Sequence, residues 1–198
     1  PTPSSAASDV YKRQTIKFAI QLYDNLIVEA VLIPSNKRVT ACVSSQVGCS
    51  LDCNFCATSK IKKMRNLESY EIFDQIMLLN KESINHFSSH ITNIVFMGMG
   101  EPLLNYKNVI ESIDQITSDF GIGISYKKIT VSTSGISKMI KKMADDDVKF
   151  NLAISLHTAL EKTRNKVMPF SKSFPIKELV DSLESVSYTH LTLPTMEL

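Results

Sequence analysis

The sequence lacks any apolar run long enough to cross a lipid bilayer. Its longest apolar stretches, such as IVFMGM at residues 94–99, are far shorter than a membrane-spanning helix. No basic start is followed by the apolar region of a signal peptide, and no repeat or low-complexity tract is present. The excess of charge is also small, with a formal net charge of +2 over 198 residues. These absences predict a cytoplasmic globular protein with one main core and no membrane partner.

Cysteine is scarce as well, and its distribution is uneven. All four cysteines lie within the fifteen positions from Cys42 to Cys56, and the last three, Cys49, Cys53 and Cys56, have the spacing C-x3-C-x2-C. In a reducing compartment, thiols clustered this closely indicate metal ligands or redox chemistry rather than structural disulfides. The segment GCSLDCNFC is therefore the first candidate for a functional site.

The two ends of the chain match the codon pattern of a sequencing-library adaptor. DVYKRQ at residues 9–14 and VSYTHL at residues 186–191 can be encoded by the two strands of one such adaptor. We therefore expect residues 1–14 and 186–198 to be adaptor-derived and to lie outside the core. The rest divides into an N-terminal β-hairpin extension at residues 15–36 and a truncated core at residues 37–185.

β-rich and helix-forming segments alternate along the core. Two β-rich runs at residues 18–24 and 26–34, with the turn signal Asp24-Asn25 between them, predict the hairpin. Further strands are predicted at residues 38–45, 91–98, 127–133 and 149–157, and helices at residues 67–84, 108–120, 137–145 and 175–185. Four strand–helix units in succession predict an α/β fold with a parallel sheet, in the form of a partial (β/α) barrel.

A polar or glycine-rich segment follows each of the four core strands. In chain order these segments are GCSLDCNFC, GMGEP, STSG and SLH. The carboxyl ends of parallel strands meet at one edge of a sheet, which is where such folds place their chemistry. The four segments therefore predict one shared site.

Two kinds of metal site are compatible with the cysteine spacing. Three thiolates can hold three irons of a four-iron cluster and leave the fourth iron open, as a catalytic site requires. Zinc usually takes four ligands, so a zinc site would need Cys42 or His157 in addition. Phe55, before the last cysteine, can shield the metal site from water, can be a core aromatic residue, or can be both. The spacing favours the iron–sulfur cluster and leaves zinc as the alternative.

The motif CxxxCxxC with an aromatic residue before its last cysteine resembles the radical S-adenosylmethionine (SAM) superfamily. Longer stretches resemble one family within it, the dual-specificity ribosomal and transfer RNA adenine-C2 methyltransferases (RlmN family). These stretches are CVSSQVGCSLDCNFCAT at residues 42–58, FMGMGEPLLNY at 96–106, ITVSTSG at 129–135 and NLAISLH at 151–157. The likeness extends over about residues 15–185. The sister group that methylates adenine C8 is the alternative, although GMGEP and STSG fit the C2 enzymes better.

The resemblance implies a [4Fe–4S] cluster held by Cys49, Cys53 and Cys56, with SAM bound at its open iron. It also implies cofactor contacts from Gly100, Glu101, Ser132, Ser155, Leu156 and His157. Glycine lets the backbone approach a ligand closely, and a carboxylate accepts hydrogen bonds from an ammonium group. Taken alone, these residues also have structural explanations: GMG as a tight turn, Ser132 as a helix N-cap and His157 as a satisfied polar residue ending a strand.

Catalytic roles for Cys42 and Glu29 follow from the resemblance only. In the family, a second cysteine near the C-terminus carries the methyl group that is joined to adenine C2. The cysteine that matches Cys42 then releases the RNA by forming a disulfide with that carrier, and Glu29 matches the residue proposed to accept the C2 proton. By themselves, Cys42 resembles a small buried strand residue and Glu29 a solvent-facing carboxylate. We expect the carrier cysteine and a further asparagine contact to lie beyond residue 185, so this chain alone should not methylate RNA.

The partners implied by the resemblance are 23S ribosomal RNA, transfer RNA and an electron donor such as flavodoxin, and a monomer is expected. Basic residues around the cysteine segment either contact RNA phosphates or form a solvated loop: Lys37, Arg38, Lys60, Lys62, Lys63 and Arg65. The stretch SKIKKM at residues 59–64 departs from the glycine-containing loop of common family members. A noncatalytic zinc-binding RNA module is the alternative from another functional class.

Overall fold

The computed structural model describes residues 14–190, with side chains described as far as residue 186. Its strands are β1 (Ile16–Gln21), β2 (Ile27–Ser35), β3 (Arg38–Cys42), β4 (Gln46–Val47), β5 (Arg65–Asn66), β6 (Asn93–Phe96), β7 (Ile129–Thr133) and β8 (Asn151–Ile154). Its α-helices are α2 (Ser69–Phe87), α3 (Tyr106–Thr117), α4 (Ser137–Asp145), α5 (Glu161–Val167) and α6 (Ile176–His190). Short 3-10 turns are η1 (Ala57–Lys60), η2 (Pro102–Asn105), η3 (Tyr126–Lys128) and η4 (Pro169–Ser173).

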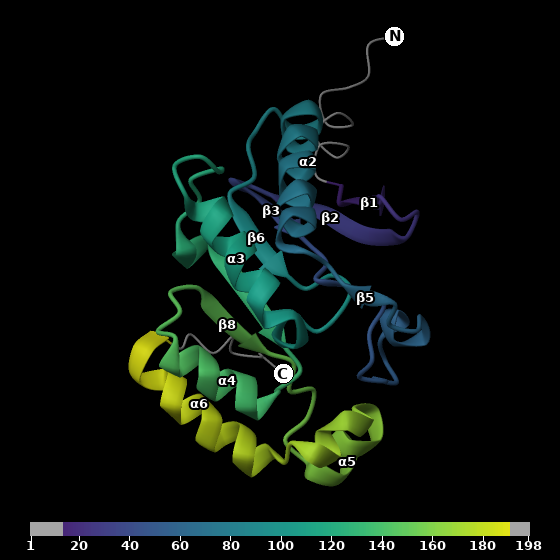
Figure 1. Ribbon diagram of the computed structural model, residues 1–198, viewed down its shortest axis with the longest axis vertical. Helices are drawn as coiled ribbons and strands as arrows, with labels where there is room; N and C mark the ends of the chain where they lie inside the picture. The colour runs from purple at the N-terminus through teal and green to yellow at the C-terminus, as the bar shows by residue number, and fades with distance from the viewer. Residues whose placement is uncertain (1–13, 191–198) are drawn as a thin grey trace.

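The main sheet has six strands in the order β1-β2-β3-β6-β7-β8. The first three strands pair antiparallel, and β3, β6, β7 and β8 pair parallel. Each parallel strand is followed by at least one helix (Figure 1). The predicted α/β fold of four strand–helix units with an N-terminal hairpin is confirmed. The hairpin turns at Asn25, whose φ of 64° is in the left-handed region that asparagine tolerates.

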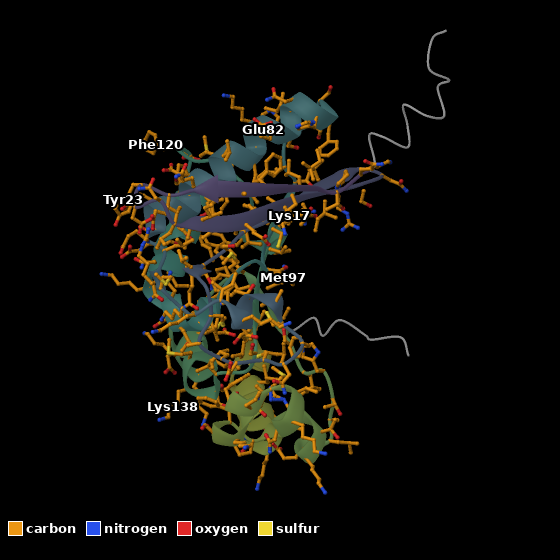
Figure 2. All side chains as sticks on the ribbon, turned by 90° about the vertical axis from the view of Figure 1, so that its right-hand side faces the viewer. Lys17, Tyr23, Glu82, Met97, Phe120 and Lys138 are labelled. Atoms are coloured by element: carbon orange, nitrogen blue, oxygen red, sulfur yellow. The ribbon has the colours of Figure 1, made fainter. Side chains whose placement is uncertain are left out.

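Helices cover one face of the sheet, and the hydrophobic core lies between these helices and the sheet (Figure 1). On α2, the side chains of Ile72, Ile76 and Leu79 are fully buried, as their helical spacing predicts. In β2, Val28 and Leu32 alternate with exposed residues and join this core. The opposite face, which includes Lys17 and Met97 (labelled in Figure 2), is more exposed. Side chains on that face are therefore free to line a site.

Two parts of the fold differ from the prediction. The expected strand at residues 38–45 ends at Cys42 in the main sheet, and the two-residue strand β4 then pairs with β5. Between β8 and α6 the chain forms α5 and η4, neither of which the sequence pattern indicates. The β4–β5 pair joins the two segments that flank the cysteine loop, and α5 accepts hydrogen bonds from Asn54 within the loop.

The expectation that residues 186–198 lie outside the core is wrong at its first position. Val186 is 5% exposed and belongs to the core, because α6 continues to His190 without a break. The predictions for residues 1–13 and 191–198 concern positions outside the described part of the chain.

No helix in the described part of the chain is long and apolar enough to cross a membrane.

Candidate active site

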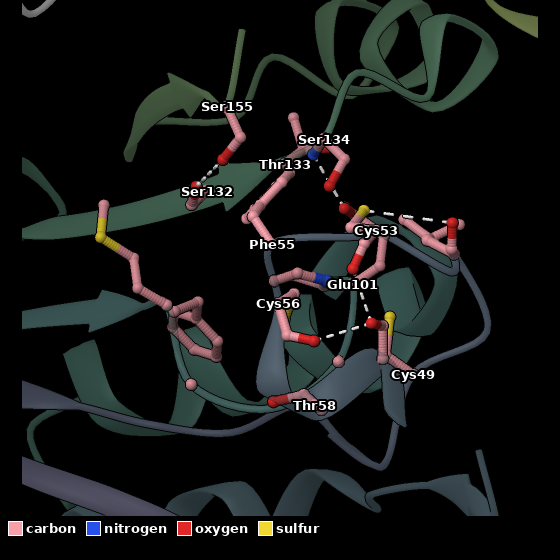
Figure 3. A pocket seen from close by; sticks show the side chains of 17 residues that line it. Cys49, Cys53, Phe55, Cys56, Thr58, Glu101, Ser132, Thr133, Ser134 and Ser155 are labelled. Carbon is pink, nitrogen blue, oxygen red and sulfur yellow. Dashed lines mark hydrogen bonds between the residues drawn. The ribbon is translucent and has the colours of Figure 1, made fainter. Parts of the chain in front are cut away.

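A cavity of about 270 Å³ opens at the carboxyl end of the parallel strands (Figure 3). All four predicted segments contribute to its lining, so the convergence expected from the strand order is observed. The lining residues from these segments are Cys49, Leu51, Cys53, Phe55, Cys56, Gly98, Gly100, Glu101, Pro102, Ser132, Thr133, Ser134 and Ser155.

Hydrogen bonds within the cysteine loop fix its shape. The hydroxyl of Ser59 donates to the carbonyl oxygens of both Cys53 and Cys56, at 2.6 and 2.7 Å. The Cys56 amide donates to the Cys53 carbonyl at 3.1 Å, which closes a turn between these two cysteines. Gly48 has a φ of +75°, and a Cβ there would lie 2.5 Å from the carbonyl oxygen of Lys62. The segment 59–64 thus returns past the loop against a position that only glycine fits.

The three cavity cysteines are free thiols in a largely apolar setting. Burial raises the pKa of Cys49, and it raises that of Cys53 to about 11, with smaller contributions from the neighbouring thiols and Glu101. Metal binding requires thiolates, so a bound cation must displace these protons. The sulfur atoms face a common cavity (Figure 3).

The donor set fits a cluster better than a single zinc ion. No group of three His, Cys, Asp or Glu side chains within residues 14–186 converges as ligands of one ion do. A cubane presents separate irons to separate thiolates, so its ligands need not converge on one point. The two candidates for a fourth zinc ligand, Cys42 and His157, are not among the cavity-lining residues. Three thiols around one cavity therefore fit a cluster with an open iron.

Among the described residues, Glu101 is the one carboxylate in the cavity wall, and it is 2% exposed. Its Oε1 accepts from the Leu103 amide at 3.2 Å and its Oε2 from the Ser134 amide at 2.8 Å. Burial raises its pKa, and these hydrogen bonds act in the opposite direction. A carboxylate has about four acceptor positions. Glu101 thus retains capacity for a cationic ligand group in the cavity.

Gly100 allows the backbone to pass against Gln46. Its φ is +95°, and a Cβ at this position would lie 2.5 Å from Cβ of Gln46. The Gln46 side chain is fully buried and accepts from the Glu101 amide at 2.9 Å. The tight-turn explanation of GMG therefore holds, and the same turn sets Glu101 in the cavity wall.

Ser132 and Ser155 end neighbouring strands and face each other, with their hydroxyl oxygens 3.3 Å apart (Figure 3). The N-cap explanation of Ser132 is wrong, because Ser132 lies inside β7 and the α4 N-cap is Ile136. Leu156 and His157 follow Ser155 but do not line the cavity. The His157 ring instead packs on Phe55, with 3.9 Å between ring centroids, and its φ is 60°.

Phe55 is 51% exposed, so it is not a core residue. It lines the cavity, and its ring contacts the His157 ring, which lies outside the cavity wall. Burial lowers the pKa of His157, with a further contribution from the charge of Arg164. A neutral imidazole is therefore favoured in this stacked pair.

Glu29 and Cys42 lie on the more exposed face of the sheet, beside the cavity rather than in its wall. Cys42 pairs with Val31 and Val95 in the register, and Glu29 is two residues from Val31 on the same face. Cys42 is buried, which raises its thiol pKa, whereas a hydrogen bond from the Met97 backbone lowers it. Glu29 is half exposed and forms an ion pair with Lys17, 2.5 Å between Nζ and Oε1. The two residues lie on the same face of the sheet as Met97, which also lines the cavity.

The basic residues fall into different environments. Lys37 and Arg38 stand at the amino end of β3, the end opposite the cysteine loop, so they do not flank the cavity as expected. Arg65 pairs with Asp24 and Glu71 and is a structural residue. Lys60 and Lys62 are exposed on the segment that follows the cysteines.

Several cavity residues could not be singled out from the sequence. Thr58 and Ser59 stand in a loop whose composition resembles any polar turn, and Met97 looks like a core residue although it is 50% exposed. The one sequence signal that could have indicated them is their position: Thr58 and Ser59 follow the cysteine motif, and Met97 follows a buried strand.

A family model for the radical SAM superfamily matches residues 43–193 of this chain. Proteins named probable dual-specificity RNA methyltransferase RlmN are similar to it. The relative from Flavobacterium psychrophilum is 65% identical over 170 residues, which cover 86% of this chain and 49% of the relative. The relative from Chlorobaculum tepidum is 47% identical over 194 residues, 96% of this chain and 52% of the relative. The chain thus spans about half the length of the curated relatives it matches.

A crystal structure of a radical SAM methyltransferase from Sphaerobacter thermophilus has the same arrangement of elements. The TM-score is 0.86 at 31% sequence identity, and the match covers 96% of this chain and 61% of that structure.

Proposed function

This chain belongs to the radical SAM superfamily, and we propose that it is the cluster- and SAM-binding part of an enzyme that methylates adenine C2 in 23S ribosomal RNA and transfer RNA. The high identity to proteins named for that dual specificity supports the choice of substrate. Because the chain spans about half of these relatives, the proposal assigns the complete reaction to the longer protein.

One observation carries this proposal: the three cysteines of a single loop line the same cavity as a buried carboxylate and two strand-end serines. Cys49, Cys53 and Cys56 would hold a [4Fe–4S] cluster, which with SAM supplies radical chemistry by reductive cleavage of the sulfonium. Glu101 would accept hydrogen bonds from the SAM ammonium group, because its buried oxygens retain free acceptor positions.

The other polar residues would orient the cofactor and limit water. Ser132 and Ser155 place two hydroxyls side by side at the ends of β7 and β8. Leu156 and His157 follow Ser155 but do not line the cavity, and they would add further contacts to the bound cofactor. The contacting rings of Phe55 and His157 would limit the access of water from the loop side.

Glu29 and Cys42 would act on the RNA adenine rather than on SAM. Glu29 would accept the proton from adenine C2, and Lys17 holds its carboxylate on the more exposed face of the sheet. Cys42, diagonally across on that face, would attack the sulfur of a methyl-carrying cysteine of the longer protein, to which the product is still bonded through the transferred carbon. A disulfide would form between the two cysteines as the bond between that sulfur and the transferred carbon breaks, and the carbon would keep the electron pair and take up a proton. Exposed Lys60 and Lys62 would meet RNA phosphates near the cavity.

Anaerobic reconstitution with iron and sulfide tests the proposal. The expected product is a brown protein with broad charge-transfer absorption that changes on addition of SAM. A colourless protein that binds zinc instead would support the noncatalytic zinc module. A protein without either metal would overturn the assignment of the cysteine loop.

A further inference from the structure

Arg164 is the most deeply buried charged side chain of the described chain. It lies on α5 and is 0% exposed. Its Nη2 donates to the Ser134 carbonyl oxygen at 2.8 Å. Within residues 14–186, Nε and Nη1 have no hydrogen-bond partner and no carboxylate forms an ion pair with the guanidinium.

An unpaired buried guanidinium is costly, because burial removes water from a charge that needs hydrogen-bond acceptors. The Phe170 ring, 6.0 Å from the guanidinium carbon, offers partial compensation. The charge of Glu161 on the same helix acts on Arg164, but its Oε2 accepts a hydrogen bond from the Ile176 amide and forms no ion pair with the guanidinium. A bound anionic group near Arg164 would offset this charge further.

The helix that carries Arg164 is attached to the cysteine loop. The Asn54 amide donates to the Val167 carbonyl at 2.9 Å, and the Asn54 side chain donates to the Lys166 carbonyl at 2.6 Å. Asn54 directly follows Cys53, so these two hydrogen bonds hold α5 against the cysteine loop. On its other side Arg164 contacts the Ser134 segment of the cavity wall. The cation thus sits behind the wall that faces the proposed cluster.

We propose that Arg164 is the internal counter-cation of the cluster bound by Cys49, Cys53 and Cys56, and that its charge raises the cluster's reduction potential. The inference rests on the proposed function, because it requires a cluster in this cavity. Three thiolates and a cluster carry net negative charge, and one-electron reduction by an external low-potential donor adds another negative charge. A fixed cation nearby stabilises the reduced form more than the oxidised form.

The test uses the full chain, reconstituted anaerobically, in four variants. Arg164→Met removes the charge and keeps most of the side-chain length, and Arg164→Gln removes it while keeping a donor for the Ser134 carbonyl. Arg164→Lys keeps the charge. Lys162→Met is the matched control, because it removes an exposed cation from the same helix. The midpoint potential is measured by titration with dithionite, following the paramagnetic signal of the reduced cluster, and iron and sulfide are counted.

The expected result is a more negative midpoint for Arg164→Met and Arg164→Gln at unchanged iron content. Arg164→Lys and Lys162→Met should stay close to the parent. An unchanged midpoint in the two neutral variants would overturn the inference, and so would an equal shift in the lysine variant. Failure of the parent chain to take up any cluster would instead count against the proposed function.

The apo chain gives a second readout with the opposite sign. Removing an unpaired buried charge is neutral or stabilising when an apolar side chain fills the space. Arg164→Met should therefore melt at the parent's temperature or above it in the absence of iron. If both neutral variants unfold in the apo state while Arg164→Lys folds, the charge supports the fold rather than the cluster, and the inference is wrong.

Discussion

At the scale of single residues, Cys42 differs from the other three cysteines in what it faces. Cys49, Cys53 and Cys56 line the cavity, whereas Cys42 is a buried residue of β3. Replacing any of the three by alanine should abolish cluster binding, because in the proposed cluster each would hold its own iron. Cys42→Ala should retain iron and sulfide at the parent level after anaerobic reconstitution. Equal iron loss in Cys42→Ala and Cys53→Ala would refute this ligand assignment.

Substitution of Gly100 should destabilise the protein more than substitution of Gly123, another glycine with a positive φ. Both Gly100 and Gly123 have positive φ, but only at Gly100 would a Cβ collide, 2.5 Å from Gln46. Gly100→Ala should therefore lower the free energy of unfolding by about 1–3 kcal/mol more than Gly123→Ala. Urea unfolding of the two apo variants measures this difference. Equal losses of stability in the two variants would mean that the Gln46 side chain can move aside without an energetic penalty.

Site residues were predictable where a motif fixes both residue type and spacing. The three cysteines, Gly100 and Glu101 stand in such motifs, and all five line the cavity. Arg164 could not be found in this way, because it is one of three basic residues in EKTRNKV, a composition typical of a solvated helix. Its burial arises from the packing of α5 against the cysteine loop and the Ser134 segment, which only the tertiary structure shows.

At the scale of elements, one arginine joins the hairpin to the first core helix. Arg65 donates from Nη1 and Nη2 to Glu71 on α2, at 2.7 and 2.8 Å, and from Nε to Asp24 in the hairpin turn at 2.7 Å. Glu71 is 5% exposed and also caps the start of α2. The segment that follows the cysteine loop and contains Arg65 is thereby held to both the hairpin and α2.

Arg65→Met should lower the free energy of unfolding by about 1–3 kcal/mol, because it leaves the buried Glu71 carboxylate without its charged donor. Lys107→Met is the control, since Lys107 forms an exposed pair with Glu111 on α3. That control should stay within about 0.5 kcal/mol of the parent. Chemical unfolding of the three apo proteins tests both values. A silent Arg65→Met would show that the hairpin is held by apolar packing alone.

Elements were predictable in proportion to their length and periodicity. The helix expected at residues 137–145 has those bounds in the structure, since its apolar residues repeat at helical spacing. β4 and β5 have two residues each, too few to show any period. Helix α5 carries a buried arginine where the pattern would need an apolar residue, which explains why it was missed.

At the scale of the whole molecule, α6 offers a test of the chain's C-terminal end. We propose that residues 186–198 are adaptor-derived, and Val186 shows that such a residue can still pack in the core. A chain that ends at residue 185 should be less stable by about 1–3 kcal/mol than one that ends at residue 190, because it loses a buried valine. Thermal unfolding compares the two. Identical stability would mean that Val186 contributes nothing to the core.

The complete methylation reaction should require residues of the longer protein in addition to those of this chain. The proposed reaction needs a cysteine to carry the methyl group, yet three of the four cysteines face the cavity and the fourth, Cys42, is assigned to product release. The chain also spans about half of its curated relatives. With reductant, labelled SAM and 23S ribosomal RNA, we therefore expect no 2-methyladenosine from this chain alone.

Restoring the remaining half from a close relative should restore methylation, and it allows the role of Cys42 to be isolated. In that longer protein, Cys42→Ala should still bind the cluster but stop after the methyl carbon has joined the protein to the RNA. The trapped species should migrate on a denaturing gel as a protein–RNA adduct that ribonuclease removes. Cys49→Ala should give neither adduct nor product, because it lacks the cluster. Repeated turnover by the 198-residue chain, or free methylated RNA from Cys42→Ala, would contradict the division of roles among the four cysteines.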